Sequence, residues 1–120
     1  MRKHLLLLLS VLLSFSLVAA ACGDDDEGSD VSVGLVFDIG GEGDQSFNDS
    51  AAAGLARAAD ELGVATSKVS PNDDGSNRAE LLQLQADNSD IVLAIGFLFA
   101  GDAAAVSGEN PDINFAVVDD

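Results

Sequence analysis

The residues best suited to ligand chemistry lie in one short stretch, Val33–Ser50. Its sequence is VGLVFDIGGEGDQSFNDS: an apolar run ends on Asp38, a glycine-rich turn follows, and Phe47 and Asn48 stand where helical periodicity begins. A buried strand, a tight turn and a helix start form the opening of a βαβ unit. Ligands of open α/β sheets bind outside the carboxyl ends of the strands. We therefore expect these three residues at a binding edge.

The composition excludes most catalytic and metal chemistry. The only histidine, His4, lies in a leader segment, and the only cysteine, Cys22, follows that leader directly. A Ser-His-Asp or Cys-His arrangement and a zinc site of ordinary composition are therefore ruled out in the mature sequence. The glycine turn lacks a following Lys and Ser or Thr, so it is no P-loop. We predict no enzyme, no metal and no cofactor.

The chain is strongly acidic, with 21 acidic residues against five basic ones and a formal charge of −16. Such a surface repels phosphate groups, so nucleic acid and anionic lipid headgroups are not expected partners. The charge also disfavours phosphorylated ligands, because no basic cluster exists to receive them. A solvated, salt-adapted surface is the plainer interpretation of this acidity.

Residues 1–21 have the features of a targeting segment. A short positive region and an apolar core, Leu5–Val18, lead to the string LVAAAC, which ends at Cys22. The string resembles a bacterial lipobox, although Ala19 stands where Leu is more usual; an ordinary secretory signal cleaved at the alanines is the alternative. We predict a lipoprotein signal peptide over 1–21, a lipidated Cys22 and a disordered acidic tether over 22–30.

Past the tether, strand and helix patterns alternate with short connections. Strands are predicted at 31–38, 64–70, 91–95 and 113–118, and helices at 46–62, at 77 to about 88, and from the end of the Gly96–Phe99 turn to about 108. The second strand is half polar, which suits an edge, and the third is fully apolar, which suits a central parallel strand. We predict an α/β fold with a parallel sheet in the order 2-1-3-4.

The first two helices have recognisable boundaries and faces. Ser46-x-x-Asp49 resembles a capping box, and Gly63 is the expected end of the first helix. The expected buried positions are Ala52, Leu55, Ala59 and Leu62 in the first helix and Leu81 and Leu84 in the second, with Leu82 left open.

The sequence stops directly after the fourth predicted strand. No further helix follows to cover that flank of the sheet, and open sheet edges favour aggregation. We therefore expect this chain to be the front part of a longer protein.

Two strings resemble the basic membrane protein family of substrate-binding lipoproteins. They are VGLVFDIGGEGDQSFNDSAAAGL and AIGFLFAGDAAAVSGENPDINFAVVDD, which together bracket Val33–Asp120. The resemblance implies a nucleoside-binding component of an ABC importer, built from two α/β lobes of the periplasmic-binding-protein type I kind. Residues 31–120 would then form the first part of lobe one, and the second lobe would be absent from this chain.

The resemblance implies roles for two of these residues in particular. Phe47 resembles the aromatic residue that stacks on a purine base, whereas a Phe at a helix start can also simply pack into the core. Asp119 resembles the carboxylate that holds ribose hydroxyls. Asp120 is its rival, because strand alternation lets only one of the two face the cleft.

Further ligand contacts are expected around them. Asp38 corresponds to a polar ligand contact, and Gly96 and Phe97 to a contact through the backbone. Asn48 offers a donor and an acceptor to a purine edge, or alternatively caps the helix. Asp44 is expected to be a turn residue and Asp102 a structural one.

Together with the lipobox, this resemblance implies a membrane-anchored, extracytoplasmic protein that delivers purine or related nucleosides to an ABC permease. A calcium-dependent nucleoside hydrolase is one alternative, because Asp38 and Asp44 superficially resemble its aspartate-rich turn. Three glycines separate the two, however, and the tandem Asp pair of that turn is missing. A lipid-anchored nucleoside sensor is a second alternative.

Overall fold

The computed structural model describes residues 28–119. The predicted signal peptide, Cys22, most of the acidic tether and Asp120 lie outside the described residues. No helix in the described part is both long and apolar enough to cross a membrane.

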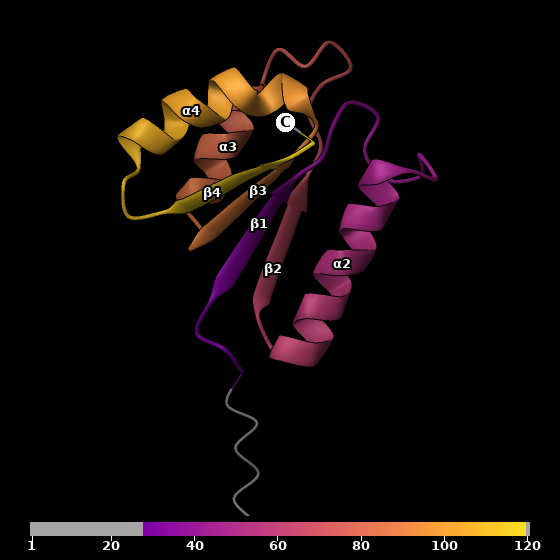
Figure 1. The fold of residues 1–120 in the computed structure, drawn as a ribbon, viewed down its shortest axis with the longest axis vertical. Helices are drawn as coiled ribbons and strands as arrows, with labels where there is room; N and C mark the ends of the chain where they lie inside the picture. The colour runs from indigo at the N-terminus through magenta and orange to yellow at the C-terminus, as the bar shows by residue number, and fades with distance from the viewer. Residues whose placement is uncertain (1–27, 120) are drawn as a thin grey trace, which may run out of the picture.

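Strands and helices alternate along the chain, as predicted (Figure 1). They are β1 (Ser32–Val36), α2 (Phe47–Leu62), β2 (Ala65–Val69), α3 (Arg78–Ala86), β3 (Ile91–Ile95), the 3₁₀ helix η1 (Phe97–Phe99), α4 (Ala100–Glu109) and β4 (Asn114–Val118).

The four strands form one parallel sheet in the order β2-β1-β3-β4, which confirms the predicted topology. β1 is central: Val33 is in register with Thr66 of β2 and with Ile91 of β3. At the start of these strands the Ser32 hydroxyl and backbone N–H donate to the Asp90 carboxylate, at 2.7 and 2.8 Å. These bonds lower the pKa of Asp90 below its ordinary value, the hydroxyl contributing most.

Helices pack on both faces of the sheet, with α2 on one face and α3 and α4 on the other (Figure 1). Residues of the two inner strands, β1 and β3, therefore contribute to both cores. The α2 face buries Val33, Leu35, Phe37, Leu55 and Ile95. The opposite face buries Val36, Leu82, Ala86, Val92, Ala94, Phe99, Ala103 and Val106.

Two leucines predicted to be buried are exposed instead. Leu62 is 66% exposed, because a helix of 16 residues is about 24 Å long and a strand of five only about 17 Å, so its last turn overhangs β1. Leu84 is 48% exposed, because α3 turns Leu82, Gln85 and Ala86 inward. Leu82, which the pattern left open, is fully buried.

The predicted end of α2 is confirmed, but its predicted cap is wrong. Gly63 is left-handed, with φ 66°, and its N–H donates to the carbonyl of Ala59. At the start of α2, Ser46 makes no side-chain capping bond. The Asp44 carboxylate takes that part by accepting from the N–H groups of Asn48 and Asp49, at 2.9 and 3.0 Å. A carboxylate has two acceptor oxygens where a hydroxyl has one, so it can hold several N–H groups at once.

Candidate ligand-binding site

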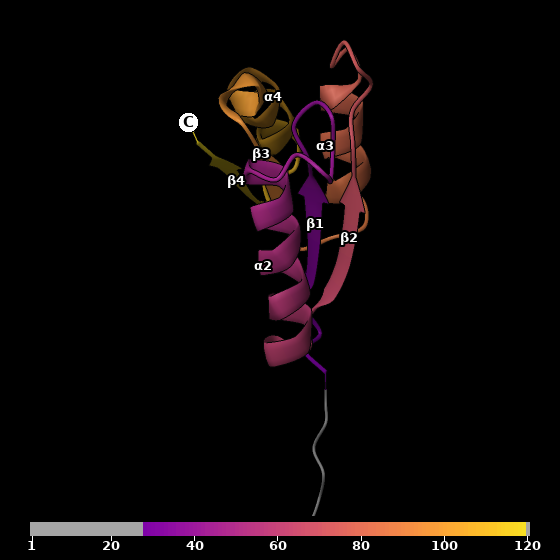
Figure 2. The ribbon, with the colours of Figure 1, turned by 90° about the vertical axis from the view of Figure 1, so that its right-hand side faces the viewer.

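The connection from β1 to α2 arches above the carboxyl end of β1 (Figure 2). Asn48 holds this loop together from inside. Its Oδ1 accepts from the N–H of Asp38 at 2.9 Å, and its Nδ2 donates to the carbonyls of Gly41 and Asp38, at 3.0 and 3.4 Å. The side chain is only 2% exposed. In this conformation Asn48 positions the loop, and direct contact with a ligand would require it to leave these bonds.

The end of β1 meets the end of β3 through Asp38 and Gly96. A Cβ atom built on Gly96 would lie only 2.7 Å from Oδ2 of Asp38, so the carboxylate packs directly against the glycine. Gly96 also has φ 102°, a left-handed value that side chains rarely adopt. Because β1 leads to α2 on one face and β3 leads to α4 on the other, this contact marks the switch point where open α/β sheets bind ligands.

Two aromatic rings stand exposed at this edge. Phe47 begins α2 and is 61% exposed, and Phe97 begins η1 and is 63% exposed. Phe99, two residues further on, is fully buried and has the Arg78 guanidinium 5.6 Å from its ring centre. The exposure of Phe47 argues against packing into the core. Of the three phenylalanines considered, Phe47 and Phe97 are therefore available to a flat ligand.

β4 ends beside the same site. The N–H of Gly96 donates to the carbonyl of Val118 at 2.9 Å, which places Asp119 next along the edge. Asp119 is exposed and has φ 68°, a left-handed value at a residue other than glycine. Aspartate adopts this conformation more readily than most residues other than glycine. Its rival Asp120 lies outside the described residues.

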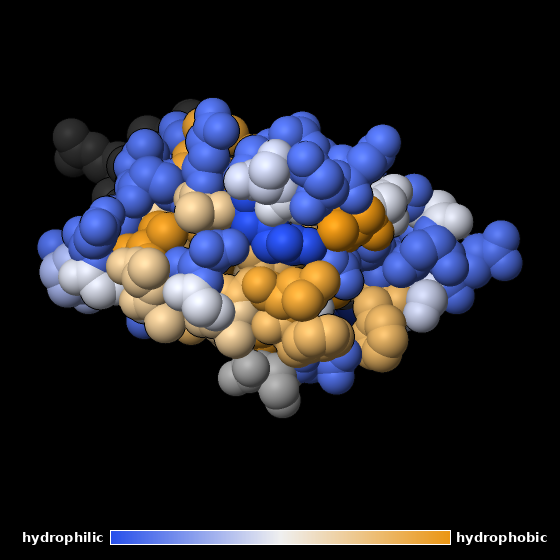
Figure 3. Space-filling view, turned by 90° about the horizontal axis from the view of Figure 1, so that it is seen from above, coloured by the Kyte–Doolittle hydropathy of each residue, from blue (hydrophilic) through white to orange (hydrophobic). Residues whose placement is uncertain are grey.

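Seen from the carboxyl ends of the strands, apolar residues form a patch bordered by hydrophilic ones (Figure 3). Ile39, in the loop after β1, is 40% exposed, and Leu98, in η1 after β3, is 49% exposed. Sequence reasoning did not single out either residue. The available signal was the run Gly96-Phe97-Leu98-Phe99, in which Phe97 and Leu98 are exposed while Gly96 and Phe99 are buried.

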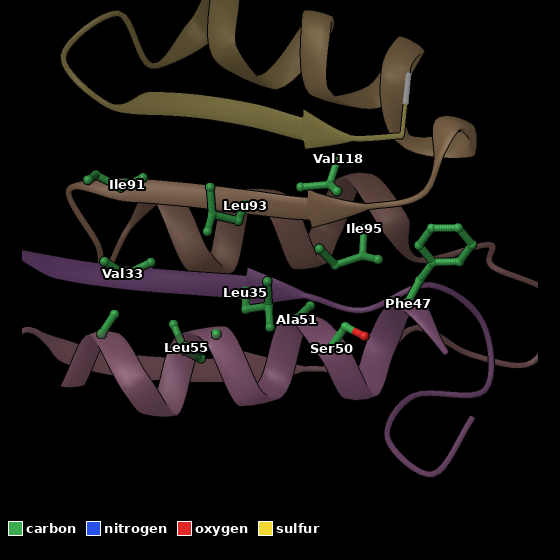
Figure 4. Close-up of a pocket in the computed structure, with 12 residues that line it drawn as sticks. Val33, Leu35, Phe47, Ser50, Ala51, Leu55, Ile91, Leu93, Ile95 and Val118 are labelled. Carbon is green, nitrogen blue, oxygen red and sulfur yellow. The ribbon is translucent and has the colours of Figure 1, made fainter. Parts of the chain in front are cut away.

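An apolar groove of about 570 Å³ runs down the α2 face from this edge (Figure 4). Side chains of β1, β3 and α2 line it, together with Val118 of β4, and Phe47 lies at the end nearest the carboxyl ends of the strands. The only hydroxyl in the lining belongs to Ser50, which already donates to the carbonyl of Ser46. The groove therefore lacks the polar groups that would orient a nucleoside, and it suits packing against another apolar surface.

The turn between Asp38 and Asp44 does not have the character of a calcium site. Asp44 uses both oxygens on backbone N–H groups, and Asp38 Oδ1 accepts from the N–H of Ile39 at 2.8 Å. Among the described residues, no three His, Cys, Asp or Glu side chains gather closely enough to hold a metal ion. A cation that needs six to eight oxygen ligands would find few free ones in this turn.

Residues 31–120 match the family described as Bmp, ABC transporter substrate-binding protein PnrA-like. An uncharacterised lipoprotein of Pyrococcus abyssi is 39% identical over 113 residues, which cover 90% of this chain and 28% of the relative. Basic membrane protein A of Borreliella burgdorferi is 29% identical over 114 residues, 94% of this chain and 33% of the relative. The chain thus spans about a third of the length of the curated relatives it matches.

Solved structures agree with these sequence matches. A crystal structure of ABC transporter solute-binding proteins from Aeropyrum pernix matches with a TM-score of 0.69 and 35% identity, over 75% of this chain and 25% of that one. A lipoprotein fragment from Peptoclostridium difficile matches with a TM-score of 0.64 and 30% identity, over 72% of this chain and 71% of that one. Because the family match runs through every described strand and helix, and both neighbours share the fold, this chain belongs to the PnrA-like family of ABC transporter substrate-binding proteins.

Proposed function

We propose that this protein captures purine nucleosides outside the cytoplasm and delivers them to an ABC permease. The observation that carries the proposal is the edge of the sheet where Asp38 packs against Gly96 and where Phe47 and Phe97, at the starts of α2 and η1, are exposed. An exposed ring can stack on a flat purine base, and a carboxylate at the same edge can accept hydrogen bonds from the polar groups of a nucleoside. Membership of a substrate-binding family supports capture in preference to catalysis.

Each residue has a proposed part in holding the ligand. Phe47 stacks on the base, and Asp38 accepts hydrogen bonds from its N–H groups. Gly96 and Phe97 contribute backbone groups, and Asp119 accepts from the ribose hydroxyls. None of these contacts needs a charged ligand, which suits a strongly acidic protein. Asn48 acts by holding Asp38 and the loop in place.

Capture would take place between two lobes, of which the described residues form part of the first. Closure of the lobes would bury the ligand and present a closed surface to the permease. No bond of the nucleoside is broken, so the proposed role is not enzymatic.

Titration calorimetry on the complete mature protein tests the function with inosine, guanosine and adenosine, the free base hypoxanthine, and inosine 5′-monophosphate. We expect a nucleoside to bind best, the base less well, and the monophosphate worse than its nucleoside. The acidic surface repels the phosphate, so raising the salt concentration should narrow that last gap. Binding of none of the nucleosides, or a preference for the monophosphate, would contradict the proposal.

The proposed anchor is a lipid on Cys22, and alanine at this position tests it. Cys22→Ala should release the protein from the membrane fraction or block processing of its leader, because lipidation needs the thiol. Fractionation followed by immunoblotting measures both outcomes. A Cys22→Ala protein that is processed normally and stays in the membrane would argue against the lipobox.

A further inference from the structure

Two carboxylates, Asp44 and Asp49, bind the backbone on either side of Phe47. Asp44 Oδ1 accepts from the N–H groups of Ser46 and Asp49, at 2.8 and 3.0 Å, and its Oδ2 accepts from Asn48 at 2.9 Å. Asp49 reaches back into the loop, where its Oδ1 accepts from Gly43 at 2.6 Å and its Oδ2 from Gln45 at 2.9 Å. Five backbone N–H groups are thus held within one short segment.

These bonds do more than cap α2. A capping residue needs to satisfy only the N–H groups of the first helical turn. The two groups that Asp49 holds, on Gly43 and Gln45, belong to the loop before the helix. Gln45 has φ 51°, a left-handed value that costs free energy and persists only where neighbouring bonds enforce it. The carboxylates therefore impose a specific shape on the loop.

Phe47 depends on that shape more than a core residue would. Its side chain is 61% exposed, so packing fixes the ring only in part. The backbone on both sides must then set where the ring stands relative to Asp38 and Gly96. The Asn48 N–H, followed by those of Ser46 and Asp49, lowers the pKa of Asp44, because these bonds favour the ionised form, in which both oxygens accept.

We propose that Asp44 and Asp49 are positioning residues that hold the Phe47 ring in the orientation required for stacking on a nucleobase. This inference rests on the proposed function, because it assigns the carboxylates a part in nucleoside affinity without ligand contact. It deepens that function by placing part of the binding energy in the shape of the unliganded loop, since a preformed loop has less freedom to lose on binding.

A first test needs no ligand. Hydrogen exchange of the complete mature protein near neutral pH should show faster exchange across residues 43–49 in Asp44→Ala than in the wild type. Asp60→Ala is the matched control, since Asp60 is an exposed residue of α2 and its replacement removes the same negative charge. It should leave exchange in this segment unchanged. Unaltered exchange in Asp44→Ala would overturn the inference whatever the protein binds.

A second test asks whether Asp44 acts through the ring. Asp44→Ala should weaken inosine binding roughly twofold to thirtyfold, because the apparent affinity falls with the fraction of the protein whose loop already has the binding shape. In a Phe47→Ala background the same change should have almost no further effect, because no ring remains to be positioned. Asp44→Asn should recover part of the loss, since its Oδ1 can still accept from Ser46 and Asp49. Thermal melts identify any variant that fails to fold, and Asp49→Asn then takes its place.

The outcomes separate this inference from the proposed function. If the wild type binds no nucleoside, the proposed function fails. The exchange experiment alone then shows whether Asp44 holds the loop in its shape. If the wild type binds and Asp44→Ala binds equally well with a loosened loop, the positioning role is wrong and the function stands. Full additivity of Asp44→Ala and Phe47→Ala would also overturn the inference, because it would show that Asp44 acts independently of the ring.

Discussion

Replacing Phe47 with alanine in the complete protein should weaken nucleoside binding roughly fivefold to more than a hundredfold, because stacking on a base contributes about 1–3 kcal/mol. Stability should fall much less than the 3–5 kcal/mol or so typical of truncating a core phenylalanine, since the side chain is 61% exposed. Calorimetry with inosine measures the first effect, and urea unfolding measures the second.

Two neighbouring phenylalanines serve as controls for that result. Phe97 is as exposed as Phe47 but is proposed to contribute only its backbone, so Phe97→Ala should reduce affinity much less. Phe99 is fully buried, so Phe99→Ala should destabilise the fold strongly. A Phe47→Ala protein that binds normally but unfolds easily would show that Phe47 is a structural residue and that the site is misassigned.

Removing the Asp119 carboxylate should weaken nucleosides strongly while scarcely changing the binding of the free base. A hydrogen bond to a charged group contributes about 1.5–3 kcal/mol, so the loss of even one should cost roughly tenfold or more in affinity. The free base has no ribose, so it makes no hydrogen bond of this kind with Asp119. Calorimetry with inosine and hypoxanthine therefore reports on Asp119 alone.

The choice of variant matters because Asp119 has a left-handed backbone, with φ 68°. Alanine would add backbone strain there, whereas glycine adopts this conformation freely. Asp119→Gly should thus lose ribose affinity without losing stability, and Asp119→Asn should recover only part of the affinity, because it keeps one acceptor oxygen and no charge. Asp120→Ala is the control for the neighbouring carboxylate. Equal losses of inosine and hypoxanthine in Asp119→Gly would argue against a ribose contact.

The sheet could be predicted from the sequence because its signals are local and consistent. The half-polar second strand became the edge strand β2, and the fully apolar run Ile91–Ile95 became the central β3. Gly63 ended its helix as expected. The positions of Leu62 and Leu84 could not be derived in the same way, since helix overhang and rotation depend on how the elements pack.

For the candidate site, the sequence could predict which strand ends lie together, but not the contacts that the residues make there. The carboxyl ends of β1 and β3 do meet, because parallel topology requires it. The hydrogen bonds within the loop were not predicted. Gln45 adopts a left-handed conformation that glutamine rarely takes, and the residue that caps α2 is Asp44 instead of Ser46. The burial of Asn48 follows from the same loop geometry, which cannot be predicted from the pattern of apolar and polar residues.

The pairing of β1 with β3 has a consequence for how quickly the chain folds. Ser32 and Asp90, which join the starts of these strands, are 58 residues apart in the sequence. When only β1, α2 and β2 have emerged during synthesis, β1 is paired on one side alone, with β2. Contacts this distant slow folding, because a long loop must close before they form. During that interval the apolar residues of β1 stay open to wrong partners, which makes the time before Ile91–Ile95 arrives the period of greatest aggregation risk.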